Sequence, residues 1–168
     1  MTVRFLERSE YARTKALAAA CFGSSDELDE YYDRDIRDHR VAVLEDRGEV
    51  LSMAHLRRVL AAYENRTVPV WYILYVCTAE GCRHRGYMDR VLRFVLRTLK
   101  EEGEAFTFLV PIDPAIYRHL GFTHAWRFRE AERELLYADD GLTECDACLL
   151  NAEAFTPPVS LRPVGRPV

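Results

Sequence analysis

The chain has 168 residues, 49% of them hydrophobic, which suits one domain with a sizeable core. Its 23 Lys and Arg residues against 27 Asp and Glu give a net charge of -4, so the molecule as a whole would not attract a nucleic-acid backbone. We find no secretory signal and no run of roughly 20 apolar residues that could span a membrane. We therefore expect a cytoplasmic protein with neither nucleic acid nor membrane as partner.

The first expected elements are a short strand and two helices. Residues 3–7 read as the strand, and residues 9–23 as a helix with Ser9 as its cap and Gly23 as its stop. Residues 24–36 begin with a serine cap and carry Asp and Glu in the first turn, where they complement the helix dipole. The sequence therefore predicts a second, acidic helix there.

The middle of the chain predicts sheet. Residues 39–45 and 49–60 alternate between polar and apolar, and a turn at 46–48 would join them in a hairpin. Residues 68–78 form an apolar run typical of a strand buried on both faces.

A long amphipathic helix is expected to begin near Gly86. Its apolar face would be formed by Met88, Val91, Leu92, Val95 and Leu99, and another face carries Arg90, Arg93, Arg97 and Lys100. We interpret the basic face as a solvated surface.

The remaining elements complete a mixed α/β protein. Residues 104–111 predict a strand, and residues 113–122 a short helix between Asp113 and Gly121. Residues 123–137 alternate and predict one or two last strands.

The C-terminal part is expected to be an extension of the domain. Residues 143–155 could form a short helix, and residues 157–168 hold four of the seven prolines. We therefore divide the chain into a domain at 1–137 and an extension at 138–168.

No complete metal motif is present. The five cysteines, at positions 21, 77, 82, 145 and 148, are too few and odd in number for a disulfide scaffold, so free thiols are expected. Residues 145–148 have the spacing of half a zinc knuckle, but no second pair of ligands follows. We predict no metal site.

Positive charge gathers directly before the long helix. Arg83, His84, Arg85 and Gly86 lead into the helix start, where unpaired N–H groups and the positive end of the dipole favour an anion. Glycine lets a ligand approach the backbone closely. A phosphate or pyrophosphate fits such a cradle best.

Two common phosphate-binding motifs fail at this loop. Tyr87 and Met88 stand where a P-loop requires Lys and Ser or Thr, and only Gly86 is placed for a dinucleotide fingerprint. A third pattern, Gln/Arg-x-x-Gly-x-Gly/Ala after a strand, matches residues 83–88 except that Met88 replaces the small residue.

With this loop and with "IYRHLGF" at residues 116–122, the chain resembles the GNAT superfamily of N-acetyltransferases. "RHRGYM" and "FTFLVPIDPAIYRHLGF" are most similar to its Eis-type (enhanced intracellular survival) branch. The resemblance implies an α/β (α+β) GNAT fold, with a mixed, mostly antiparallel central sheet and helices on both faces.

The resemblance also implies acetyl-CoA as co-substrate. In the superfamily the pantetheine arm lies along the strand before the loop, and the matching positions here are Val76, Cys77 and Thr78. The pyrophosphate would lie over the loop. The implied cofactor-binding residues are Val76, Cys77, Thr78, Arg83, His84, Arg85, Gly86, Tyr87 and Met88.

Tyr117 matches the tyrosine of the superfamily signature, and we expect it to be the general acid that protonates the leaving thiolate. The alternative is a packing role beside Phe122. Cys77 could form an acetyl-enzyme, but it lies on a predicted buried strand without an activating base. His55 and His124 are candidate bases, although structural roles are favoured for both.

The sequence thus predicts an N-acetyltransferase that moves acetyl from acetyl-CoA to a primary amine by direct attack in a ternary complex. The acceptor is a small molecule or a protein, and the acidic second helix could attract a cation. The alternatives are a non-catalytic acyl-CoA-binding module and an enzyme for a longer acyl donor. A homodimer is left open.

Overall fold

The computed structural model describes residues 1–63, 66–128, 143–150 and 162–163. It has a mixed α/β fold with a mostly antiparallel sheet, as expected. The chain forms two compact units, each described here by itself: Met1–Arg57 with Ile73–Thr98, and Arg58–Tyr72 with Leu99–Val168.

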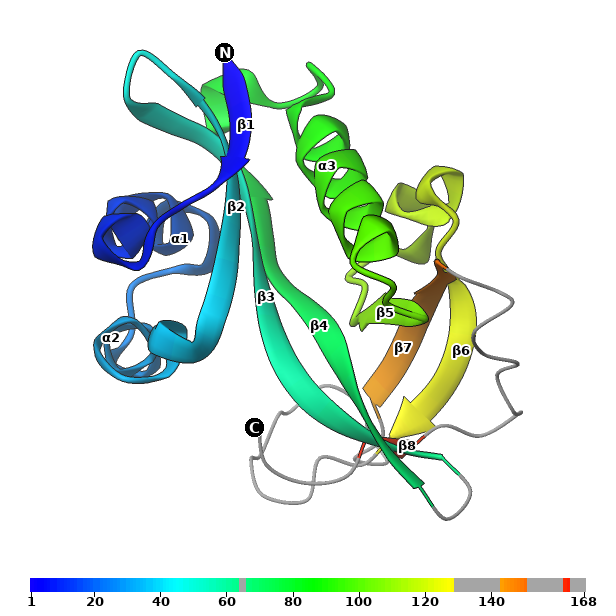
Figure 1. Ribbon diagram of the computed structural model, residues 1–168. Helices are drawn as coiled ribbons and strands as arrows, with labels where there is room; N and C mark the ends of the chain where they lie inside the picture. Colours follow the sequence, from blue (N-terminus) through cyan, green and yellow to red (C-terminus); the bar gives the residue numbers. More distant parts are fainter. Residues whose placement is uncertain (64–65, 129–142, 151–161, 164–168) are drawn as a thin grey trace. The chain divides into compact units, whose positions relative to one another are not determined.

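The first unit is a sheet covered by helices on both faces. Its strand order is β1 (Thr2–Phe5), β2 (His39–Asp46), β3 (Glu49–Tyr63) and β4 (Arg66–Thr78), and β3 and β4 continue into the second unit. Three α-helices belong to it: α1 (Lys15–Phe22), α2 (Asp26–Asp33) and α3 (Tyr87–Glu101), the last ending in the second unit. Figure 1 shows α1 and α2 on one face of these strands and α3 on the other.

The predicted hairpin is confirmed, with a bulge that the pattern did not reveal. Arg47 and Gly48 both have positive φ, at 51° and 85°, as a two-residue type I′ turn requires. A register shift between Leu44 and Glu45 changes the pairing of the rest of the hairpin, so that Val41 lies opposite His55.

Of the predicted helix limits, one was wrong and two are confirmed. The first helix begins as a 3-10 helix at Arg8, where the Glu7 N–H donates to the Glu10 carboxylate at 2.9 Å, so Ser9 is not the cap. Gly23 ends α1 with a φ of 88°, and the Ser25 hydroxyl caps α2 by accepting from the Leu28 N–H.

Helix α3 buries the predicted apolar face. Val91, Leu92, Val95 and Leu99 have no exposed surface, and the four basic residues of the other face are exposed. Strand β4 differs from expectation, because only Val70, Ile73 and Cys77 of its described side chains are buried and the others are half-buried or exposed.

The second unit is built around β7. Its strand order is β3, β4, β5 (Phe106–Leu109), β7 (Thr143–Leu149) and β6 (Thr123–Phe128), and β8 (Arg162–Pro163) pairs with β3. Strand β7 pairs antiparallel with both β5 and β6. The predicted helix at 143–155 was therefore wrong over 143–149, because pairing on two sides outweighs the helix propensity of Glu, Ala and Leu.

The segment after β5 forms two 3-10 turns in place of one short helix, Pro114–Ile116 and Arg118–Leu120. The predicted ends hold: the Asp113 carboxylate accepts from the Ala115 N–H, and Gly121 is left-handed with a φ of 91°. The division of the chain at 137/138 stays a prediction.

Candidate active site

The residues expected to bind the cofactor all lie in the first unit, in two successive segments. Val76, Cys77 and Thr78 end β4, and residues 83–88 join a short 3-10 turn to α3. The expected pantetheine strand and the expected phosphate loop thus lie within 13 consecutive residues, 76–88.

The loop presents its backbone to an anion. His84 and Gly86 both have left-handed φ, at 62° and 72°. The first helical bond runs from the Arg90 N–H to the Gly86 carbonyl at 3.1 Å, so the N–H groups of the first turn have no helical acceptor. A Cβ at Gly86 would meet no atom within 4 Å, so the space above this backbone is open. Such a turn at a helix N-terminus suits a phosphate.

The loop's side chains divide into two kinds. Arg83, His84 and Arg85 are exposed, and the Arg83 Nε–H donates to the Thr78 carbonyl at 3.4 Å. Tyr87 is buried and Met88 half-buried. Tyr87 can therefore serve a ligand mainly through its backbone N–H.

Ser52 of β3 holds the end of β4. Its hydroxyl donates to the Cys77 carbonyl at 3.0 Å and lies 2.9 Å from the Thr78 hydroxyl. Burial, and then the neighbouring Cys21 thiol, raise the pKa of Cys77. A buried thiol held in this form is a poor nucleophile, which argues against an acetyl-cysteine intermediate.

Tyr75 lies within β4, just before this segment. Its φ is 49°, a left-handed conformation that is strained for a residue with a large side chain. Its ring contacts three others, at centroid distances of 5.3 Å to Phe22, 4.7 Å to Tyr31 and 5.5 Å to His55. Aromatic contacts of this kind help to hold the strained backbone.

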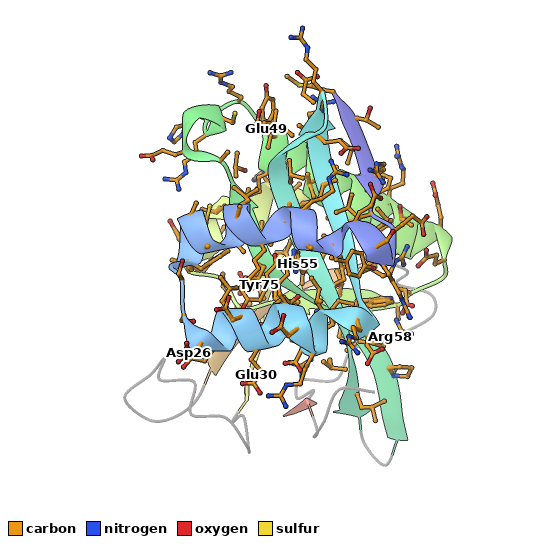
Figure 2. The ribbon with its side chains drawn as sticks, turned by 90° about the vertical axis from the view of Figure 1, so that its left-hand side faces the viewer. Asp26, Glu30, Glu49, His55, Arg58 and Tyr75 are labelled. Carbon is orange, nitrogen blue, oxygen red and sulfur yellow. The ribbon has the colours of Figure 1, made fainter. Side chains whose placement is uncertain are left out.

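A buried hydrogen-bonded chain lies beside Tyr75. The Tyr31 hydroxyl lies 2.8 Å from the Nδ1 atom of His39 and 2.7 Å from the Nδ1 atom of His55. Figure 2 shows His55 and Tyr75 close together behind α1 and α2. We call His55, Tyr31 and His39 the histidine–tyrosine relay.

Burial keeps both imidazoles of the relay neutral. It lowers the pKa of His55 to about 3 and the pKa of His39 to about 4. Burial raises the pKa of the Tyr31 hydroxyl far above its ordinary value. The Nε2 atom of His55 is buried and has no hydrogen-bond partner among the described residues.

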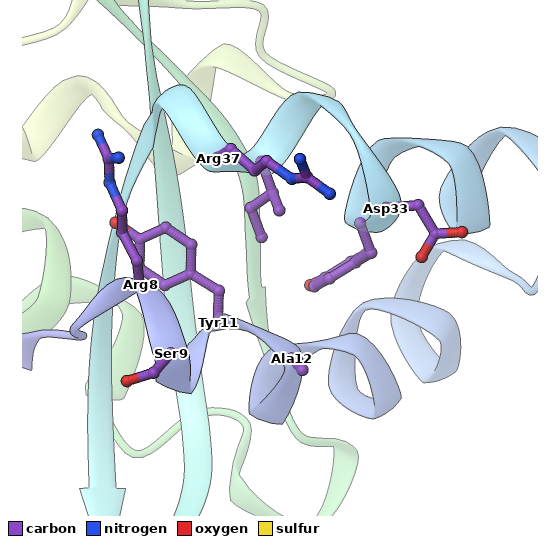
Figure 3. A pocket seen from close by; sticks show the side chains of 8 residues that line it. Arg8, Ser9, Tyr11, Ala12, Asp33 and Arg37 are labelled. Carbon is purple, nitrogen blue, oxygen red and sulfur yellow. The ribbon is translucent and has the colours of Figure 1, made fainter.

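A separate open hollow of about 420 Å³ lies between the 3-10 helix at Arg8–Thr14 and the segment from α2 to Arg37 (Figure 3). Its lining mixes charge and aromatic surface, and consists of Arg8, Ser9, Tyr11, Ala12, Tyr32, Asp33, Ile36 and Arg37. No residue of the expected cofactor site lines it. Tyr32 lies between this hollow and the histidine–tyrosine relay, because it lines the hollow and its ring lies 6.1 Å from that of His55.

Tyr117 and His124, two other candidate catalytic residues, lie in the second unit. Tyr117 is buried, its ring stands edge-on to Phe122 at 6.0 Å, and burial raises the pKa of its hydroxyl. This contact fits the packing alternative, and the raised pKa keeps a proton available for an acid. His124 is 61% exposed, with its Nδ1 atom 4.0 Å from the Asp146 carboxylate.

The acidic residues around α2 are largely exposed, but two of them are already paired. Asp29 lies 2.8 Å from the Lys15 ammonium, and Glu30 pairs with Arg34. The negative electrostatic potential that α2 offers to a cationic acceptor is therefore weaker than the sequence suggested.

Two searches of the described residues gave negative results. No group of three or more His, Cys, Asp or Glu side chains is arranged to hold a metal ion. No described helix is long and apolar enough to cross a membrane.

Sequence reasoning missed Tyr31, His39, Ser52 and Tyr75. The relay depends on the bulge at Leu44 and Glu45, which places both histidines on one face of the hairpin. With the register that the turn alone would give, they would face opposite sides. No local sequence motif predicts such a site. Once the register is known, two buried histidines on adjacent strands indicate it.

Comparison with solved structures places the fold. The chain is similar to a GNAT family N-acetyltransferase (YhbS) of Escherichia coli in complex with CoA, with 19% identity, a TM-score of 0.72 and coverage of 97% of this chain and 89% of that one. It is similar to a GCN5-related N-acetyltransferase of Kribbella flavida, with 24% identity, a TM-score of 0.63 and coverage of 75% and 35%. For Eis1 of Mycobacterium abscessus the identity is 21%, the TM-score 0.63 and the coverage 76% and 33%.

The chain spans about a third of the length of the last two proteins. Curated proteins gave no match. The family model for the acetyltransferase (GNAT) domain matches residues 2–125, most of the chain. The chain therefore belongs to the GNAT acetyltransferase family.

Proposed function

We propose that this protein transfers an acetyl group from acetyl-CoA to a primary amine by direct attack in a ternary complex. The observation that carries the proposal is the loop before α3, where left-handed His84 and Gly86 leave open space beside N–H groups that have no helical acceptor. Pyrophosphate would bind these groups, and Arg83 and Arg85 would add charge. The CoA bound to the similar E. coli protein supports this choice of ligand.

The end of β4 would hold the pantetheine arm and the thioester. Tyr75 has a left-handed φ of 49° within β4, directly before Val76. An N–H that points at the thioester carbonyl would stabilise the oxyanion by about 3 kcal/mol. The buried Cys77 thiol has no role as nucleophile in this scheme.

Tyr117 would protonate the departing thiolate. Its raised pKa keeps the phenol protonated at neutral pH, although transfer to a thiolate is then somewhat more uphill than for an ordinary tyrosine. Tyr117→Phe keeps the ring against Phe122 and deletes the proton. We expect kcat to fall on the order of 10²-fold with CoA affinity unchanged.

That variant needs an assay in which chemistry limits the rate, so single-turnover mixing is the appropriate measurement. Phe122→Leu is the matched control, because it disturbs the same ring contact without removing a hydroxyl. If Tyr117→Phe turns over at the wild-type rate, Tyr117 is a packing residue.

The acceptor is proposed to be a small molecule or a protein amine. The hollow near Arg8 and Arg37 lies beside Tyr32, and its mixed charge would suit the distal part of an acceptor with both polar and apolar groups. The sequences of residues 83–88 and 106–122 are the basis on which the Eis-type branch is proposed. A cytoplasmic location agrees with the free thiols at Cys21 and Cys77.

The experiment that tests the function combines binding and turnover. Calorimetry measures CoA affinity, and thiol release from acetyl-CoA is followed with spermidine, kanamycin, lysine and tyramine as acceptors. Tight CoA binding without thiol release would identify a non-catalytic binding module. Faster release from butyryl-CoA than from acetyl-CoA would identify a longer acyl donor. Absence of CoA binding would refute the proposal.

A further inference from the structure

The relay contains one buried polar atom that the protein itself does not satisfy. His55 has no exposed surface, its Nδ1 atom is engaged by Tyr31, and its Nε2 atom lacks a partner among the described residues. An unpaired buried polar atom destabilises the folded state, so it is rarely kept without a use. A proton donor that is present only during binding or reaction would satisfy it.

The position of His55 fits such a donor. Its ring contacts Tyr75 at 5.5 Å, and Tyr75 directly precedes the expected pantetheine positions Val76, Cys77 and Thr78. On its other side Tyr75 contacts Phe22, which is 46% exposed. A row of aromatic rings thus runs from the surface to His55, next to the strand where acetyl would be transferred.

The hydrogen bonds of Tyr31 restrict the tautomers. A hydroxyl donates one hydrogen, so it can donate to the Nδ1 atom of one histidine while it accepts from the Nδ1–H group of the other. If Tyr31 donates to His39, then His55 carries its proton on Nδ1, and its Nε2 atom is a bare acceptor. This arrangement makes His55 a base.

We propose that His55 is the catalytic base, whose Nε2 atom accepts the proton of the attacking amine, and that Tyr31 and His39 hold His55 in the tautomer that leaves this atom bare. The inference rests on the proposed acetyl transfer and adds to it the group that takes up the amine proton.

The proton balance of the step is complete. The amine nitrogen bonds to the carbonyl carbon, the C–S bond breaks, and the amine proton goes to His55 Nε2. Tyr117 gives its proton to the departing thiolate in the same step. After the products leave, His55 loses one proton and Tyr117 takes one up, so the reaction as a whole releases no proton, and Tyr31 and His39 keep their tautomers throughout.

The surroundings of the relay differ at its two ends. His39 is 5% exposed, whereas His55 is fully enclosed, so the outer end is His39. Asp35 and Asp38 lie near His39 and favour its charged form, and Arg57 opposes it. The hydroxyls of Tyr11, Tyr32 and Tyr75 also lie against the relay. Burial keeps His39 neutral, so its Nδ1 atom can accept the Tyr31 hydrogen.

The test begins with the tautomer, which does not depend on turnover. Long-range ¹H–¹⁵N NMR of labelled protein distinguishes protonated from bare imidazole nitrogens. We expect His55 Nε2 to be bare and its ¹⁵N shift to change when butylamine is added to the CoA complex. A proton on His55 Nε2, or no response to the amine, overturns the proposal.

The second arm uses variants chosen to keep the fold. His55→Asn places an amide near the position of Nδ1 and removes Nε2, whereas His55→Gln reaches the position of Nε2 without a base. We expect kcat to fall about 10²-fold in both, with CoA affinity and the KM of the amine within about twofold. Tyr31→Phe keeps the ring contacts and removes the hydroxyl that fixes the tautomer of His55, so kcat should fall about tenfold.

His119→Asn is the matched control, since it makes the same chemical change at an exposed histidine and should leave kcat unchanged. Thermal unfolding separates a base from a packing residue, because a purely structural role would lower the melting temperature and the fraction of active protein without changing kcat per active site. An active wild type with an equally active His55→Asn overturns only the inference about His55. A wild type without turnover overturns the proposed function, and the NMR measurement then decides the role of His55.

Discussion

The loop before α3 presents exposed arginines and backbone amides without a helical acceptor, whereas the histidine–tyrosine relay consists of side chains that are almost inaccessible to solvent. Both belong to the first unit. The loop is encoded by six consecutive residues, and the relay by residues from α2, β2 and β3. A binding site made of backbone can thus be local in sequence, whereas a site made of buried side chains depends on how the strands pair.

A low pH should distinguish the two regions most strongly, because it protonates the buried histidines of the relay and so destabilises the fold. Folded His39 has a pKa of about 4 against about 6.5 when unfolded, so its contribution to stability is present above pH 6.5 and is lost as the pH falls through 4. The loss reaches about 3 kcal/mol at pH 4. Urea unfolding between pH 7 and pH 4 measures it.

The slope of the unfolding free energy against pH counts the protons taken up on unfolding. His39→Asn should lower this count by up to one, and a double variant with His55→Asn should lower it further. An equally steep dependence in the double variant would mean that the histidines are not the groups that titrate.

The backbone of the loop should give the next largest effect. Gly86→Val puts a branched side chain at a φ of 72° and into the open space above the loop. We expect CoA affinity to fall about 30-fold, in line with the 1–3 kcal/mol by which such a conformation is disfavoured. Calorimetry with CoA is the measurement.

Gly81→Ala is the control for Gly86→Val, because Gly81 also has open space around it but is not left-handed. Its CoA affinity should equal that of the wild type. Equal affinities in both variants would remove Gly86 from the site.

The charged side chains of the loop should matter less than its backbone. Arg83→Ala and Arg85→Ala each remove one charged hydrogen bond to phosphate, so CoA affinity should fall about tenfold, and less at high salt. Arg97→Ala, on the exposed face of α3, should change nothing. If all three variants bind CoA equally, the arginines are ordinary surface residues.

The smallest expected effect is at Ser52. Ser52→Ala removes its hydrogen bond to the Cys77 carbonyl, so the free energy of unfolding should fall by about 1 kcal/mol. Ser9→Ala, at an exposed site that caps no helix, is the comparison. If Ser9→Ala lowers the free energy of unfolding by as much, the Ser52 hydrogen bond does not account for the loss.

Features that are local in sequence could be predicted, whereas those that depend on strand pairing could not. The hairpin, the apolar face of α3 and the loop at residues 83–88 were predictable because each depends on neighbours in the chain. Strand β7 was not, because Thr143–Leu149 is extended only through its pairing with β5 and β6. The relay was not predictable either, since one extra residue in a strand decides which face a histidine occupies.

At Tyr75 the strain of the backbone and the packing of the side chain have opposite effects on stability. Glycine would adopt a φ of 49° without strain, so Tyr75→Gly relaxes the backbone while it removes the ring between Phe22 and His55. Other small residues would keep the strain, because only glycine adopts this conformation freely. Glycine in turn would lose the ring contacts with Phe22, Tyr31 and His55. No single substitution at position 75 therefore gives both a relaxed backbone and a packed ring.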